Sequence, residues 1–324
     1  MKHILTLIFL LFLLPPTIPA IKLENRMPES VWQAEISLKI VPSYSRAFNG
    51  YGEEAPLQNL MLWDRGWYDL VEGELKREEK RLELKLAYGL TEDWVVEAMI
   101  PMVQKIQSSS LKFDAGTPDQ QKVISNLSSE ELNGLGDINI QFGKDLSYST
   151  TWHNRGGFTI RLPTGNKGMR RGISSNSIGE GHGSVGAFIH VTWYPLVHGF
   201  RNGFRIEGKN ELTGERETLE GEKVYYSAGH RADLYYSWSI ERQNVFAGTE
   251  LHYFQQSESK LPTGESNASF LKEINFEFGY GNLSELEQKP LSYPWQVRIG
   301  YTRPFAGQNT PLIHRWELSS TFLF

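Results

Sequence analysis

Residues 181–184 read Gly181-His182-Gly183-Ser184, a short spacing whose residue types could support catalysis. A serine hydroxyl becomes a nucleophile when a neighbouring histidine removes its proton, and a third group must orient that histidine. His182 and Ser184 could fill the first two roles where a loop is predicted to enter a strand. The flanking glycines fit an ordinary loop equally well, and we favour the loop interpretation.

Other short motifs in the chain give no comparable chemistry. Gly181, Gly183 and Gly186 have the spacing of a dinucleotide fingerprint, but no βαβ pattern surrounds them. The eight histidines are scattered without metal-ligand spacing. Cysteine is absent, which excludes thiolate ligands, cysteine nucleophiles and disulfides. We therefore expect no catalytic residue, no metal and no cofactor, and hence no enzyme.

Charged residues at alternate positions are the strongest chemical signal in the sequence. Between residues 204 and 212, Arg205, Glu207, Lys209 and Glu211 alternate in sign, and Phe204 and its apolar companions occupy the positions between them. In an extended strand, successive side chains point to opposite faces. The sequence thus predicts strands with one charged and one apolar face.

The elements that position these charges are predicted to be about twelve strands, with ten or fourteen as alternatives. Each alternates with the period of an extended chain and is close to the length that a tilted membrane strand requires. The predicted ranges are 31–45, 80–90, 94–102, 137–142, 157–162, 185–193, 204–212, 226–238, 245–254, 271–280, 295–302 and 314–324.

The predicted connections alternate between long and short along most of the chain. Those after the odd-numbered strands are mostly long, and those after the even-numbered strands are mostly short. Outer-membrane barrels show this parity, with short periplasmic turns and long external loops. Residues 107–134 are expected to be a long polar connection, whereas residues 281–292 are too long for a periplasmic turn and break the pattern.

Alternation does not by itself say which face lies inside, because a soluble lipocalin-like barrel places its apolar face inward. Three features favour the inverted, membrane arrangement. The last strand ends on Phe324, bulky Trp94, Trp193, Trp238 and Trp295 lie near strand ends, and the opposite faces carry charges of both signs. The predicted fold class is therefore all-β, a transmembrane antiparallel β-barrel with Phe324 as its assembly signal.

In that fold, the charged faces line the lumen of the barrel. They form either a structural network of ion pairs that fills a narrow barrel or a polar path for a solute. The predicted lumen residues are Glu35, Lys39, Glu83, Lys85, Glu97, Arg161, Arg205, Glu207, Lys209, Glu211, Arg231, Asp233, Glu273, Glu277, Arg298, Arg315 and Glu317.

The first connection, residues 46–77, is unusually apolar for a loop. Leu62, Trp63 and Trp67 lie within it. It is either an extended rim packed on itself or a gate folded into the mouth of the barrel. The gate interpretation would allow it to receive a small apolar or aromatic compound.

The chain is predicted to begin with a secretory signal peptide, residues 1–20, followed by the barrel, residues 21–324. Lys2 and His3 precede the apolar run from Ile4 to Leu14, and Ala20 is a plausible cleavage point. The run is shorter than the about 20 residues needed for a spanning helix. We expect the bacterial outer membrane as the location, its lipid and the barrel-assembly machinery as partners, and, at a pI near 6.0, no nucleic acid.

Three short segments resemble a known family. They are Leu84 to Met102 (LKLAYGLTEDWVVEAMIPM), Gly134-Leu135-Gly136-Asp137-Ile138 and Arg161-Leu162-Pro163-Thr164-Gly165. The chain is similar there to uncharacterised bacterial outer-membrane β-barrels, a domain of unknown function related to the proposed transporters of the MetA pathway of phenol degradation. The resemblance implies an outer-membrane barrel and outer-membrane transport.

The His182–Ser184 spacing also resembles the catalytic pair of outer-membrane phospholipase A, another barrel of that size, in which an asparagine orients the histidine. Pro195 and Leu196 stand where that asparagine would be expected. Three function classes therefore compete: a passive, porin-like channel for small molecules, a structural or adhesive barrel, and a lipid hydrolase. The channel is our expectation.

Overall fold

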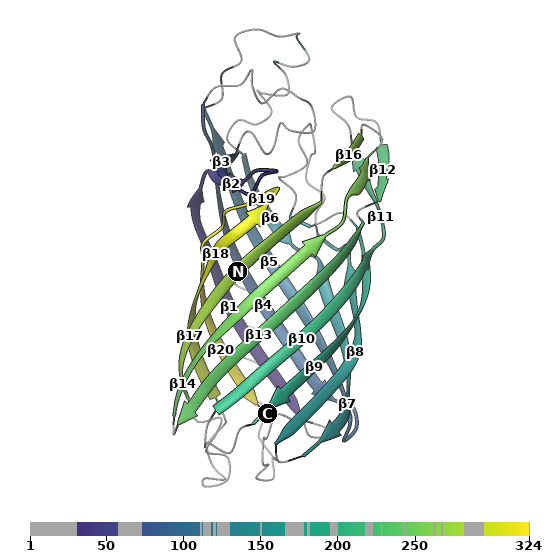
Figure 1. Cartoon of the computed structure of the whole chain (residues 1–324), viewed down its shortest axis with the longest axis vertical. Helices are drawn as coiled ribbons and strands as arrows, with labels where there is room; N and C mark the ends of the chain where they lie inside the picture. The colour runs from purple at the N-terminus through teal and green to yellow at the C-terminus, as the bar shows by residue number, and fades with distance from the viewer. Residues whose placement is uncertain are drawn as a thin grey trace.

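The computed structural model is a cylinder of antiparallel strands with small sheets above one rim (Figure 1). It describes residues 31–57, 73–110, 112, 118, 121, 130–149, 151–165, 178–179, 182–194, 200–217, 223–227, 229–242, 244–261, 264–266, 268–281 and 295–323. The predicted signal peptide, the gate residues Leu62, Trp63 and Trp67, and the terminal Phe324 lie outside these residues.

Thirteen strands form the main sheet, and β6 and β7 follow one another along β5, so they share one of twelve positions around the cylinder. The strands are β1 Trp32–Tyr44, β4 Leu75–Gly89, β5 Trp94–Ser109, β6 Glu130–Leu135, β7 Ile138–Tyr148, β8 Trp152–Leu162, β9 Ser184–Trp193, β10 Phe200–Glu211, β13 His230–Arg242, β14 Val245–Gln256, β17 Ser269–Gly281, β18 Trp295–Gln308 and β20 Arg315–Leu323.

The last strand closes the barrel against the first. β1 pairs with β20 from Gln33↔Leu323 to Ile40↔Trp316, and its other edge pairs with β4. Closure leaves no unpaired sheet edge along these strands. Lipid contains no water to form hydrogen bonds with backbone N–H and C=O groups, so a barrel in a membrane must be closed. The predicted twelve-strand barrel and its closing strand are confirmed.

Several predicted strand boundaries were wrong, and two of the differences alter the connections between strands. Part of the expected polar connection is strand: β6 pairs with the upper half of β5, and the N–H of Gly136 donates to the Pro101 carbonyl at 2.8 Å just before β7 begins. The predicted strand 226–238 is interrupted at Gly229, whose φ of 77° is left-handed and suits glycine. β12, Lys223–Ser227, precedes that break and β13 follows it.

Two small sheets stand at the upper end of the barrel in Figure 1. One joins β11, Thr213–Glu217, to β12, then β15, Ser259–Leu261, and β16, Gly264–Ser266. The other joins β19, Thr310–Pro311, to β2, Arg46–Phe48, and β3, Glu54–Pro56. The upper end is therefore the end of the long connections, as the predicted parity requires.

Tight turns lie at the opposite end. Between β4 and β5 the Leu90 N–H donates to the Trp94 carbonyl at 2.8 Å, and the Thr91 Oγ1 accepts from the Trp94 N–H at 3.1 Å. This confirms the predicted hairpin. β17 and β18 also join at this end, so the long segment between them remains the exception to parity that the sequence indicated.

The outer wall is apolar and the inner wall is polar, the reverse of a soluble barrel. Phe158, Ile189, Phe276 and Leu318 are each more than half exposed, and many neighbouring apolar side chains share this outer face. Aromatic pairs such as Trp152 with Trp193, 5.9 Å between ring centroids, lie near the tight turns, where a membrane interface would be. The protein is thus a transmembrane β-barrel of the bacterial outer-membrane type.

No helix among the described residues is long and apolar enough to cross a membrane.

Two glycines offer a test of how closely the barrel wall is packed. A Cβ at Gly157 on β8 would lie 2.0 Å from the Phe142 carbonyl oxygen and 2.8 Å from the Phe188 ring. We expect Gly157→Ala to lower the free energy of unfolding by about 1–3 kcal/mol, because overpacking displaces neighbouring atoms. Gly208→Ala is the matched control, since a Cβ there meets nothing within 4 Å. Urea titration of both variants in detergent checks this, and equal stabilities would contradict the packing described.

Candidate functional site

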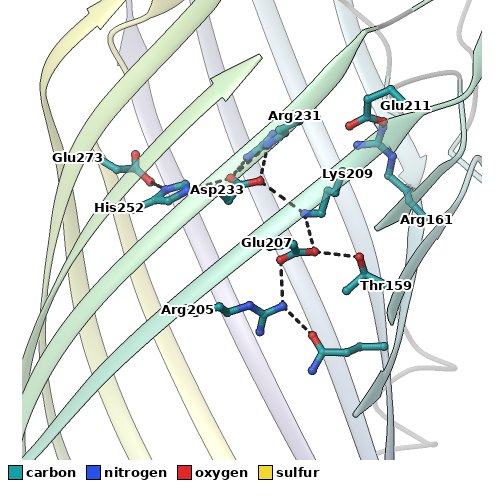
Figure 2. Close-up of polar contacts among 11 residues, drawn as sticks. Thr159, Arg161, Arg205, Glu207, Lys209, Glu211, Arg231, Asp233, His252 and Glu273 are labelled. Atoms are coloured by element: carbon teal, nitrogen blue, oxygen red, sulfur yellow. Dashed lines mark hydrogen bonds and ion pairs between the residues drawn. The ribbon is translucent and has the colours of Figure 1, made fainter. Parts of the chain in front are cut away.

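The inner wall carries a chain of charged side chains that links neighbouring strands (Figure 2). Its centre is Asp233 on β13, which is 0% exposed. Arg231 holds its carboxylate through Nη2 at 2.8 Å and Nε at 2.9 Å. The His252 Nε2 lies 3.0 Å from the same carboxylate, and its Nδ1 lies 2.9 Å from Glu273. One imidazole therefore bridges carboxylates on β13 and β17.

Glu207 on β10 extends the chain toward β8. Its carboxylate accepts from Arg205 Nη2 at 2.9 Å, from Lys209 Nζ at 3.1 Å and from Thr159 Oγ1 at 2.9 Å. The reach to Thr159 passes over β9 at Gly186, where a Cβ would lie 2.7 Å from the Thr159 hydroxyl. The missing side chain of Gly186 thus allows strands that are not adjacent to share a hydrogen bond.

A second group of ion pairs covers the wall around β1 and β4. Lys39 lies 2.7 Å from Glu83 and 3.9 Å from Glu317. Farther along, the Lys85 Nζ lies 2.9 Å from Glu97. Two more pairs lie elsewhere on the inner wall: Arg298 with Glu277 at 3.9 Å, and Arg315 with Glu273 at 3.7 Å.

His182 and Ser184, the candidate catalytic pair, are buried among charged side chains and are not placed as a nucleophile and its base would need to be. The His182 Nε2 lies 2.8 Å from the Arg161 Nη2 and 3.1 Å from the Glu211 carboxylate, and Arg161 also bonds Glu211. His182 is 7% exposed and Ser184 is 3% exposed. A lipid substrate meets the outer wall of a barrel, so a buried pair is poorly placed to attack it. This geometry favours a structural role for His182.

A cavity of about 530 Å³ lies inside the barrel. Six of the predicted lumen residues border it: Lys85, Glu97, Arg161, Arg205, Glu207 and Lys209. Of the remaining predicted residues, Glu35 forms no hydrogen bond or ion pair with any described residue, and the others form the ion pairs described above. The cavity therefore brings together charges from β4, β5, β8 and β10.

Sequence reasoning missed several residues that border the cavity: His190, Gly203, Tyr235, Ser237 and Glu250. Alternation was the signal that could have found two of them, since Gly203 shares the face of Arg205 and Tyr235 shares the face of Asp233, each two residues away. Tyr235 was overlooked because aromatic side chains abound on the outer wall. Among the described residues, no group of His, Asp and Glu side chains could hold a metal ion.

Comparison with solved structures finds similar folds among outer-membrane channels and porins. The chain is similar to the COG4313 outer membrane channel from Pseudomonas putida F1, with 11% identity over 94% of this chain and 99% of that chain and a TM-score of 0.67. At this identity the likeness shows the fold. Alignments to the NanC porin (11% identity, 89% and 98% coverage) and to the CymD monoaromatic hydrocarbon channel (10%, 92% and 89%) each have a TM-score of 0.40. No protein-family model matches, and no curated protein matches.

Proposed function

We propose that this protein is a passive channel for small molecules across the bacterial outer membrane. The supporting observation is the cavity of about 530 Å³ inside the barrel, bordered by charged and polar side chains. A wall of this kind holds water and small polar solutes, whereas a wall of packed apolar side chains would exclude them.

The size of the barrel supports a narrow channel. Barrels of about eight strands fill their interior with side chains, and those of about sixteen leave an aqueous bore. A twelve-strand cylinder lies between these limits, so a small solute could pass between the side chains of opposite walls. The related proposal, that the solute is apolar or aromatic as for the MetA-pathway transporters, is supported by the sequence resemblance and by the apolar first connection.

A sealed structural barrel is the second candidate. It is favoured by the ion pairs that tie neighbouring strands together, such as Lys39 with Glu83 and Arg231 with Asp233. In that case the charges would stabilise the wall and no solute would cross.

Conductance of the purified protein in planar bilayers separates these candidates. We expect discrete conductance steps, reduced by Gly203→Phe, because Gly203 borders the cavity. Gly208→Phe is the matched control on the same strand, since its position is open outside the cavity.

If the protein shows no conductance, the channel proposal is wrong and the sealed structural barrel is favoured. Phospholipid hydrolysis by the same sample, abolished in Ser184→Ala, would instead establish the hydrolase. Uptake of a small aromatic compound that is lost when residues 60–68 are deleted would support the aromatic solute.

A further inference from the structure

Most charges on the cavity wall are neutralised by a partner in the wall. Lys85 lies 2.9 Å from Glu97, Lys209 lies 3.1 Å from Glu207, and Arg161 bonds Glu211. Two residues differ from these. Among the described residues, Arg205 retains unused donors and Glu250 has no hydrogen-bond or ion-pair partner, so the wall carries one position that attracts an anion and another that attracts a cation.

Arg205 uses only one of its three guanidinium nitrogens in hydrogen bonds with described residues. Nη2 donates to Gln141 Oε1 at 2.8 Å and to Glu207 Oε2 at 2.9 Å. Nη1 forms no hydrogen bond with any described residue and is the donor left for a solute, since Nε, which also lacks a partner among these residues, is buried. The guanidinium carbon lies 4.5 Å from the centroid of the Phe188 ring, which fixes its position. A guanidinium with unused donors suits a planar carboxylate.

Glu250 on β14 borders the same cavity and forms no hydrogen bond or ion pair with any described residue. Its register partners are uncharged: Ser237 on β13 and Asn275 on β17. The Asn275 side-chain amide donates to Glu277 at 2.8 Å. A carboxylate in this position gains most from a cationic group that enters the cavity.

The two positions are suitably separated for one small molecule. Arg205 lies on β10 and Glu250 on β14, with β13 between them contributing Tyr235 and Ser237 to the cavity. Neighbouring strands lie about 4.8 Å apart, and Glu250 is two residues, about 7 Å, along β14 from the position level with Arg205. The two backbone positions are therefore roughly 12 Å apart, and side chains that reach into the cavity shorten this span.

We propose that the cavity binds a small zwitterion, an aliphatic amino acid whose carboxylate meets Arg205 and whose ammonium group meets Glu250. This inference rests on the proposed channel function and names a charged substrate class in place of the apolar or aromatic solute considered above. It does not depend on the first connection of the chain.

Block of single-channel current tests the inference, with 4-aminobutyrate as the probe and butyrate and butylamine as analogues that each lack one charge. We expect 4-aminobutyrate to block at roughly tenfold lower concentration than either analogue, the effect of one further charged hydrogen bond. The measurements use low salt, because salt screens the interaction. Equal block by all three compounds would overturn the inference while leaving the channel intact, whereas absent conductance would overturn the channel itself.

Variants assign the two charges separately. Glu250→Gln should remove the advantage of 4-aminobutyrate over butyrate, and Arg205→Gln should remove its advantage over butylamine. Glu131→Gln is the matched control, because its carboxylate lies exposed on β6 and bonds Gln104 and Asn133. If Arg205→Gln fails to fold, Arg205→Lys keeps the charge while losing the planar group, and should weaken carboxylate binding. If 4-aminobutyrate still blocks the Glu250→Gln variant at lower concentration than butyrate does, Glu250 does not bind the ammonium group.

Discussion

Asp233→Ala is expected to lower the free energy of unfolding of this barrel by about 3 kcal/mol. Asp233 is 0% exposed. Its carboxylate lies 2.8 Å from Arg231 Nη2, 3.0 Å from His252 Nε2 and 3.9 Å from Lys209 Nζ. Removing one partner of a buried ion pair leaves the other charge desolvated and uncompensated, which typically costs about 3–5 kcal/mol. We expect the lower end of this range, because the polar lumen leaves the remaining charges partly solvated.

Urea titration of the purified barrel in detergent, followed by tryptophan fluorescence, measures this change. Glu131→Ala serves as the control, because its carboxylate is exposed to solvent and its removal should leave the stability nearly unchanged. Equal stabilities of the two variants would show that Asp233 does not organise the inner wall.

Ile206→Arg is expected to reduce the membrane-inserted yield severely. Ile206 lies in the middle of β10, faces outward and is 46% exposed. An arginine on the lipid face near the bilayer midplane costs about 2–4 kcal/mol. Refolding into phospholipid vesicles, read from the shift in gel migration between boiled and unboiled samples, measures the inserted fraction.

Gln104→Arg provides the control on the same outer wall. Gln104 lies on β5 above the apolar belt, among the polar outward residues Lys80 and Asn133. Near an interface the cost of arginine falls to about 0–1 kcal/mol. Similar insertion of the two variants would mean that Ile206 does not contact lipid.

The amino-acid sequence by itself determined the fold class and the two faces of the strands. Side-chain alternation is a local property, so the stretch from Phe204 to Glu211 reveals its charged and apolar faces without any knowledge of its neighbours. The closing strand and the β4–β5 hairpin were predicted for the same reason. Strand ends were less certain: β5 continues to Ser109 because β4 pairs with it that far and β6 pairs with its other edge up to Gln107, and backbone pairing leaves no mark on side-chain alternation.

The tertiary structure alone decided which charges meet. Arg161 and Glu211 are 50 residues apart in the chain, and Thr159 and Glu207 are 48 apart. Their encounters depend on strand register and on the gap at Gly186, which no local pattern encodes.

The same holds for Glu250: the face on which it lies could be predicted, but not that none of the described residues pairs with it. An ion pair requires both partners to be placed in space, and only closure of the barrel places them.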